Sequence, residues 1–289
     1  MTKLDLISAQ TYVKTLAFKM GITQEEIDAL SKFEGTDFIL ESFEFLTKKL
    51  GLSKDIRPHL ELIPTIPNNP FYMMYIPSHN HIWVDLSKLE GLDKKYKFAA
   101  LRHEIQHFLQ IADVYRHETF APKIADIITE QFIAADKKSL EYVLTFSDEQ
   151  ILAAYQNNPE ALQYIMNYKN IKMQNDDKLL ADFWNQRETT YRQCVEALQQ
   201  KIKNELGVIR ADSPLTPKIE RNMGEFENVG YLNPDCSINM AKYYDTEIED
   251  EAILSQLKAQ YEFEGVRCGV KKLKEETLNK LLTEEATEV

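Results

Sequence analysis

Two of the chain's six histidines lie four positions apart in the segment LRHEIQHFLQ (residues 101–110), with a glutamate between them. Four residues span about 400° of an α-helix, so His103 and His107 share one face and both imidazoles can bind a single metal ion. Glu104 lies about 100° further round the helix, where it can reach a water molecule on that ion without being a ligand. This arrangement is typical of a zinc site in which the carboxylate acts as the general base for hydrolysis.

A helix must position this motif. Apolar residues recur at helical spacing from about Lys94 to Arg116 and define a buried face. The strand-like segment HIWVDLS (81–87) precedes this helix by a short link. We expect it to run beside the metal site and to offer its edge to an extended peptide. The alternative is that the pattern arose by chance, which is expected in about 1% of chains with this histidine content. In that case the two histidines are surface residues or buried hydrogen-bond donors. The helix and the strand favour the metal site.

In these features the chain resembles the zincin metallopeptidases. The matching part covers about residues 60–118. The resemblance implies one zinc ion per chain, hydrolysis of a protein or peptide substrate, His103 and His107 as zinc ligands, and Glu104 as the base. A third histidine six residues after His107, beyond a glycine, marks the metzincin branch, but Asp113 stands there and no glycine precedes it. The resemblance is therefore to the gluzincin branch, in which a glutamate from a later helix is the third ligand.

Glu249 is the first candidate for that third ligand. It lies in YYDTEIEDEA (243–252), which resembles a short element of small gluzincin-like peptidases: a tyrosine, a polar turn, and E-x-x-A on a helix. Tyr244, Glu249 and Ala252 match that spacing. The resemblance places the glutamate on the metal and the tyrosine hydroxyl where it steadies the tetrahedral intermediate. The separation from the histidines is far longer than in those enzymes, so residues 119–230 would form a helical insertion. The acidic run also suits an ordinary helix N-terminus.

Glu130 is the alternative third ligand. It lies in IADIITEQFIAAD (124–136), an apolar helix that should pack back on the motif helix, and its spacing suits a thermolysin-like helix pair. That family has an aspartate four residues after the glutamate, whereas Ala134 stands at that position here and Asp136 comes two residues later. An exposed charge on a packed helix is the simpler interpretation of Glu130. Asp113 and Asp136 are also candidates to hydrogen-bond the second ring nitrogen of a histidine ligand.

The chain is acidic, with 46 Asp and Glu against 34 Lys and Arg and a net charge of −12. This balance argues against a nucleic-acid-binding protein, which needs a basic footprint, and against electrostatic docking on a membrane. No apolar run approaches the ~20 residues of a membrane span, and residues 1–14 lack the apolar core of a signal peptide. Cys194, Cys236 and Cys268 form no CxxC pair. We therefore expect a reducing, cytoplasmic compartment, either in the producing cell or in a host cell into which the protein is delivered.

The pattern along the chain predicts an α+β fold that is predominantly helical, with a small zincin core and large helical additions. The core, residues 59–118, combines the motif helix with about three short strands that end in a hairpin. A helical region precedes it (1–58). A helical insertion or subdomain (119–218) and a C-terminal helical region (219–289), which carries Glu249, follow it.

The sequence therefore predicts a zinc-dependent metallopeptidase. The alternative is a zincin fold that has lost catalysis and serves as a binding or structural module, for example in a phage particle or a toxin complex. Glu104 favours the enzyme, because a module without chemistry does not need the general base.

Overall fold

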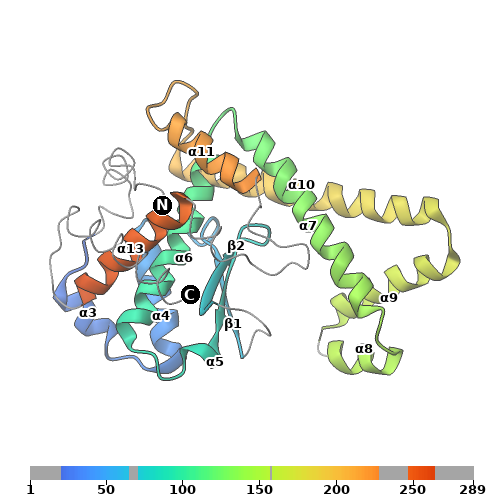
Figure 1. Cartoon of the computed structure of the whole chain (residues 1–289), viewed down its shortest axis with the longest axis horizontal. Coiled ribbons are helices and arrows are strands. Elements are labelled where there is room, and N and C mark those ends of the chain that lie inside the picture. Colours follow the sequence, from blue (N-terminus) through green and yellow to red (C-terminus); the bar gives the residue numbers. More distant parts are fainter. Residues whose placement is uncertain (1–20, 65–70, 157, 228–246, 264–289) are drawn as a thin grey trace, which may run out of the picture.

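The computed structural model describes residues 21–64, 71–156, 158–227 and 247–263. It is mostly helical with one small sheet (Figure 1), which confirms the predicted α+β, predominantly helical fold. The described strands are β1 (His59–Ile63), β2 (Met73–Ile76) and β3 (His81–Asp85). The described helices are α3 (Gln24–Leu30), α4 (Gly35–Lys49), α5 (Leu86–Leu89), α6 (Lys94–Tyr115), α7 (Ala121–Val143), α8 (Asp148–Tyr155), α9 (Pro159–Gln174), α10 (Asp177–Leu206), α11 (Thr216–Glu227) and α13 (Glu247–Phe263). Among these helices, none is long and apolar enough to cross a membrane.

The sheet has the strand order β1-β3-β2, with β3 parallel to β1 and antiparallel to β2. The segment HIWVD is thus the central strand. The prediction that it offers its edge to a peptide is wrong, because β1 and β2 occupy both of its edges. Ile82 and Val84 of β3 are fully buried, as expected for a central strand, whereas Met74 and Ile76 of β2 are only half-buried. An edge of the described sheet is instead formed by β2.

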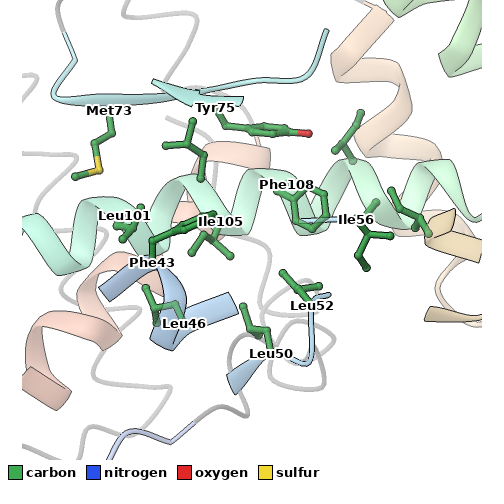
Figure 2. Packing of buried hydrophobic residues seen from close by; sticks show 14 of the residues in the cluster. Phe43, Leu46, Leu50, Leu52, Ile56, Met73, Tyr75, Leu101, Ile105 and Phe108 are labelled. Carbon is green, nitrogen blue, oxygen red and sulfur yellow. The ribbon is translucent and has the colours of Figure 1, made fainter. Parts of the chain in front are cut away.

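α6 is the central helix of the fold, with the sheet on one side and α4 on another. It begins at Asp93, whose side chain accepts a hydrogen bond from the Lys95 N–H, and no glycine or proline interrupts its 22 residues. Its bounds confirm the helix that the apolar spacing predicts. An apolar stripe of α6 fills the space between β2 and α4 (Figure 2). The residues labelled there include Leu101, Ile105 and Phe108 of α6, Met73 and Tyr75 of β2, and Phe43 and Leu46 of α4.

α13 packs along α6, although the two helices are far apart in sequence (Figure 1). The last turn of α13 lies beside the first half of α6, where the rings of Phe263 and Phe98 are 5.7 Å apart. The opposite end of α13 lies near α11, and α11 also contacts α6. The first residue of α11, Thr216, has its hydroxyl beside His117 Nε2, just beyond the end of α6. The two helices therefore run antiparallel, and the first turn of α13 lies beside the second half of α6.

A helical arm, formed by the outer parts of α7 and α10 together with α8 and α9, extends away from the core (Figure 1). It has its own hydrophobic cluster, made by Leu140, Ile151, Ile165 and Tyr168 and their neighbours. Two stacked aromatic rings, one from α7 and one from α10, lie where these helices meet the β2–β3 turn. Tyr191 of α10 lies 3.9 Å from Phe132 of α7, with parallel planes, and its hydroxyl donates a hydrogen bond to the Ser78 carbonyl. The main core takes residues from all four predicted regions of the chain, among them Leu46, Phe108, Ile202 and Met223.

Candidate metal centre

The two motif histidines converge on one point. His103 Nε2 and His107 Nε2 lie 3.0 Å apart, and the two rings are nearly perpendicular, with centroids 4.7 Å apart. Two imidazole nitrogens that each lie about 2.0–2.1 Å from the same zinc ion, at an angle between square and tetrahedral, are separated by about 2.8–3.4 Å. The spacing between the two nitrogens therefore fits two ligands of one zinc ion.

Gln110 orients one of these histidines. Its side-chain oxygen lies 3.0 Å from His107 Nδ1, and the glutamine is almost fully buried. An amide oxygen can only accept a hydrogen bond, so His107 carries its proton on Nδ1 and directs the lone pair of Nε2 toward His103. Histidines that bind metals nearly always have such a partner for the second ring nitrogen.

The aspartates predicted for that role have other partners. Asp113 forms an ion pair with Arg116, one turn away, at 2.8 Å. Asp136, on α7, accepts hydrogen bonds from Arg187 and from the Tyr164 hydroxyl, so it belongs to the helical arm. The expectation that Asp113 or Asp136 orients a histidine ligand is therefore wrong. Gln110 was missed, although its position three residues after His107 in a helix is a signal that the sequence contains.

Glu104 is held at the edge of the sheet. Its Oε2 accepts a hydrogen bond of 2.7 Å from the backbone N–H of Tyr75 on β2, and both groups are buried. The register explains this contact. Asp85 N–H bonds the Tyr72 carbonyl, and the antiparallel pairing continues through Met74 and Ile76, so the main-chain groups of Tyr75 point away from β3. The carboxylate therefore occupies an outward-facing position of the β2 edge.

The described side chains do not provide a third ligand for the histidine pair. Among them, no group of three His, Cys, Asp or Glu residues is arranged to hold a metal ion. Glu130 is exposed on α7, in keeping with the simpler interpretation of an exposed charge. His117, at the end of α6, is fully buried. Its Nδ1 accepts a hydrogen bond from the Thr119 N–H, and its Nε2 lies 3.1 Å from the Thr216 hydroxyl. Burial lowers the pKa of His117, so it is a neutral structural residue.

Glu249 lies in the first turn of α13, and the helix places that turn beside the second half of α6. The placement of its side chain lies outside what the structure describes, and Tyr244 lies outside the described residues. Glu249 comes three positions before Ala252, so the two backbone positions belong to the same side of the helix. Ala252 is fully buried in the packed side of α13. Glu249 as the third ligand stays a prediction.

No family model matches this chain, and no curated protein or solved structure matches it either. The functional argument therefore depends on the residues and on their geometry.

Proposed function

We propose that this chain is a zinc-dependent metallopeptidase that hydrolyses peptide bonds in a protein or peptide substrate. The observation that carries the proposal is the convergence of His103 and His107 at 3.0 Å between Nε2 atoms, with Glu104 on the next helical position. Gln110 supports it, because a buried acceptor on Nδ1 makes His107 a better ligand. His107 is buried and His103 is half-buried, and a cation bound between their Nε2 atoms would make use of this convergence.

In this proposal His103, His107 and Glu249 would hold one zinc ion, with Glu130 as the less favoured third ligand. Zinc, when bound, supplies a Lewis acid that polarises the scissile carbonyl and lowers the pKa of the attacking water. Glu104 takes a proton from that water and later gives it to the nitrogen of the leaving amine. The Tyr75 N–H holds one oxygen of Glu104 so that the carboxylate keeps its position through both transfers. Tyr244 donates a hydrogen bond to the developing oxyanion.

Metal analysis and a peptide-cleavage assay test this proposal together. Protein purified without a chelator should contain one zinc per chain and should cleave a mixed peptide library. His103→Ala and His107→Ala should each lose both the zinc and the cleavage, because two protein ligands bind zinc weakly. His59→Ala is the matched control, since His59 is an exposed histidine on β1, and it should change neither quantity. Wild-type protein that contains no zinc would contradict the proposal.

The helical arm is the observation that favours the alternative, a binding module on a zincin fold without catalysis. Its outer surface exposes large apolar side chains, including Tyr142 and Met173. In that case the protein would bind zinc without cleaving peptides. For either function we propose a reducing, cytoplasmic compartment, in the producing cell or in a host cell, because Cys194 is an exposed free thiol.

A further inference from the structure

The hydrogen bond that holds Glu104 comes from a short edge strand. β2 has four residues, and within the described sheet it pairs only with β3. The main-chain groups of Tyr75 point away from β3, so strand pairing does not fix them on their outer side. The Tyr75 N–H nevertheless lies 2.7 Å from Glu104 Oε2, and both residues are buried. Contacts other than the strand ladder must therefore hold Tyr75 against α6.

The side chain of Tyr75 makes two such contacts. Its ring packs against Phe108 of α6, with centroids 6.0 Å apart and planes at 83° (Figure 2). Phe108 is one turn after Glu104 in the helix, so Tyr75 contacts the same side of α6 at two positions. Its hydroxyl donates a hydrogen bond of 3.1 Å to Asn80 Oδ1. Burial raises the pKa of Tyr75, so the hydroxyl stays protonated and remains a donor.

Asn80 is held from several directions. Its Nδ2 donates to the carbonyls of Ile56 and Arg57, at 3.4 Å and 3.3 Å. Its own carbonyl accepts a hydrogen bond of 2.8 Å from the N–H of His59, the first residue of β1. Its φ angle is +52°, in the left-handed region that asparagine adopts more readily than most residues. The side chain of Asn80 therefore connects the chain before β1 to the phenol of Tyr75.

The Tyr75 hydroxyl contributes position more than apolar area. A phenylalanine would fill the same space and would make the same contact with Phe108. A buried hydrogen bond adds only about 0.5–1.5 kcal/mol of net stability, but it requires a defined distance and direction. Tyr75 is thus fixed at both ends, at its hydroxyl by Asn80 and at its N–H by Glu104. A general base needs such accuracy, because a displacement of about 1 Å can lower a rate about 10²-fold.

We propose that Asn80 and the side chain of Tyr75 are positioning residues, which hold the Tyr75 N–H where it orients the carboxylate of Glu104. This inference rests on the proposed function, because it takes Glu104 as the general base. It assigns neither side chain a contact with zinc or with substrate. Its consequence is that the rate of cleavage depends on an asparagine in the β2–β3 turn, whereas the zinc content does not.

The first test uses the Tyr75 amide as a probe of the contact. In the purified full-length protein labelled with ¹⁵N-tyrosine, Tyr75→Phe identifies the Tyr75 amide signal by removing it. A short hydrogen bond to a carboxylate, here 2.7 Å, shifts an amide proton downfield, so Glu104→Ala should move this signal upfield. Asn80→Gly removes the anchoring side chain and tolerates the positive φ, and it should move the signal in the same direction. An unchanged Tyr75 signal in Asn80→Gly would overturn the inference.

The second test separates kcat from KM and from zinc binding. Asn80→Gly should lower kcat by about 10-fold to 100-fold, because the base is displaced, and should leave KM and the zinc content unchanged. Tyr75→Phe loses only the hydroxyl and should lower kcat in the same direction. If Asn80 acts through Glu104, adding Asn80→Gly to Glu104→Gln should lower the residual rate by no more than about twofold. Circular dichroism checks that each variant is folded at the assay temperature.

Asn175→Gly is the matched control, because Asn175 also has a positive φ, +50°, and is exposed at the end of α9 in the helical arm. It should change neither the Tyr75 signal nor kcat. Multiplicative losses in the double variant, or a loss of zinc that matches the loss of kcat, would overturn the inference alone. Wild-type protein that contains no zinc and cleaves no peptide would overturn the proposed function and, with it, the role of Asn80 in catalysis.

Discussion

His107 Nδ1 lies 3.0 Å from the side-chain oxygen of Gln110, one turn further along the same helix, and both side chains are buried. This contact fixes the ring in the tautomer that leaves Nε2 able to bind a metal. It also limits rotation of the ring about its own axis. The donor and its orienting partner therefore come from one rigid helix, and their geometry does not depend on how distant parts of the chain dock.

The first prediction follows from this contact. Gln110→Leu removes the acceptor, so His107 can adopt the wrong tautomer or turn away, and zinc affinity should fall by about 10-fold to 100-fold. Gln110→Glu keeps an acceptor at the same position and should bind zinc at least as tightly as the wild type. Competition with a chromophoric chelator measures both. Gln199→Leu, at another buried glutamine, which bonds the Ala121 carbonyl, is the control. Unchanged affinity in Gln110→Leu would show that the contact is only structural.

The second prediction concerns the base. Glu104→Gln keeps the shape of the side chain, and its amide oxygen can still accept the hydrogen bond from the Tyr75 N–H. The amide cannot take a proton from water, so the rate of peptide cleavage should fall by about 10²-fold to 10⁴-fold. Zinc content should stay at one per chain. Glu130→Gln changes an exposed glutamate and should retain full activity if Glu249 is the ligand. Cleavage at the wild-type rate by Glu104→Gln would contradict the role of the base.

The third prediction concerns the close approach of α13 to α6. Ala252 is fully buried, so Ala252→Leu places three extra carbons in a space that has no room for them. Overpacking of this kind costs about 1–3 kcal/mol of unfolding free energy. Because it displaces the first turn of α13, it should also weaken zinc binding. Urea unfolding in EDTA and chelator competition measure the two effects. Ala154→Leu, at an exposed position of α8, should change neither.

Local sequence signals predicted part of this molecule well. The spacing of apolar residues predicted the helix that carries His103 and His107, and the structure forms this helix at Lys94–Tyr115. The chain also has two short patterns of the capping-box type, Thr23 with Glu26 and Ser147 with Gln150, and the structure forms both. Each of these features depends on residues three or four apart, so the sequence contains the whole interaction.

Features that join distant segments were not predictable in the same way. The three strand segments have similar length and composition, and nothing local shows that β3 takes the central place. The donor that holds Glu104 is the backbone N–H of Tyr75, which any residue except proline provides. From the sequence, Arg102 and Glu262 are of residue types that are mostly exposed to solvent. They become a buried ion pair only because α13 packs on α6.

The fourth prediction concerns the joint between the arm and the β2–β3 turn. Tyr191→Phe removes the hydroxyl that donates to the Ser78 carbonyl and keeps the stacking on Phe132. The loss of one hydrogen bond should cost about 0.5–1.5 kcal/mol. Tyr191→Ala also removes the stacked ring and should cost about 3–5 kcal/mol. Chemical unfolding measures both values. Equal costs for the two variants would contradict the importance of the stacking.

The fifth prediction depends on the environment of His79. His79 lies in the β2–β3 turn, stacked on His81 at 6.1 Å and packed against Phe132 of α7 at 5.3 Å. Burial lowers the pKa of His79, and the neighbouring His81 and Arg187 add to that effect, while Asp136 and Glu61 oppose it. The ring is therefore more readily protonated in the unfolded chain, where its pKa is about 6.5.

The fifth prediction is that stability falls as the solution is acidified. Because the folded-state pKa of His79 is the lower one, the unfolded state binds more protons, and the free energy of unfolding decreases as the pH falls below about 6.5. The decrease ends once the pH is below the folded-state pKa. His79→Phe keeps an aromatic ring in the stack and removes the titration, so its loss of stability between about pH 7.5 and about pH 5.5 should be smaller than that of the wild type. Thermal unfolding in EDTA at each pH measures this difference between the two proteins. Parallel curves for the two proteins would show that His79 is not responsible for the pH dependence.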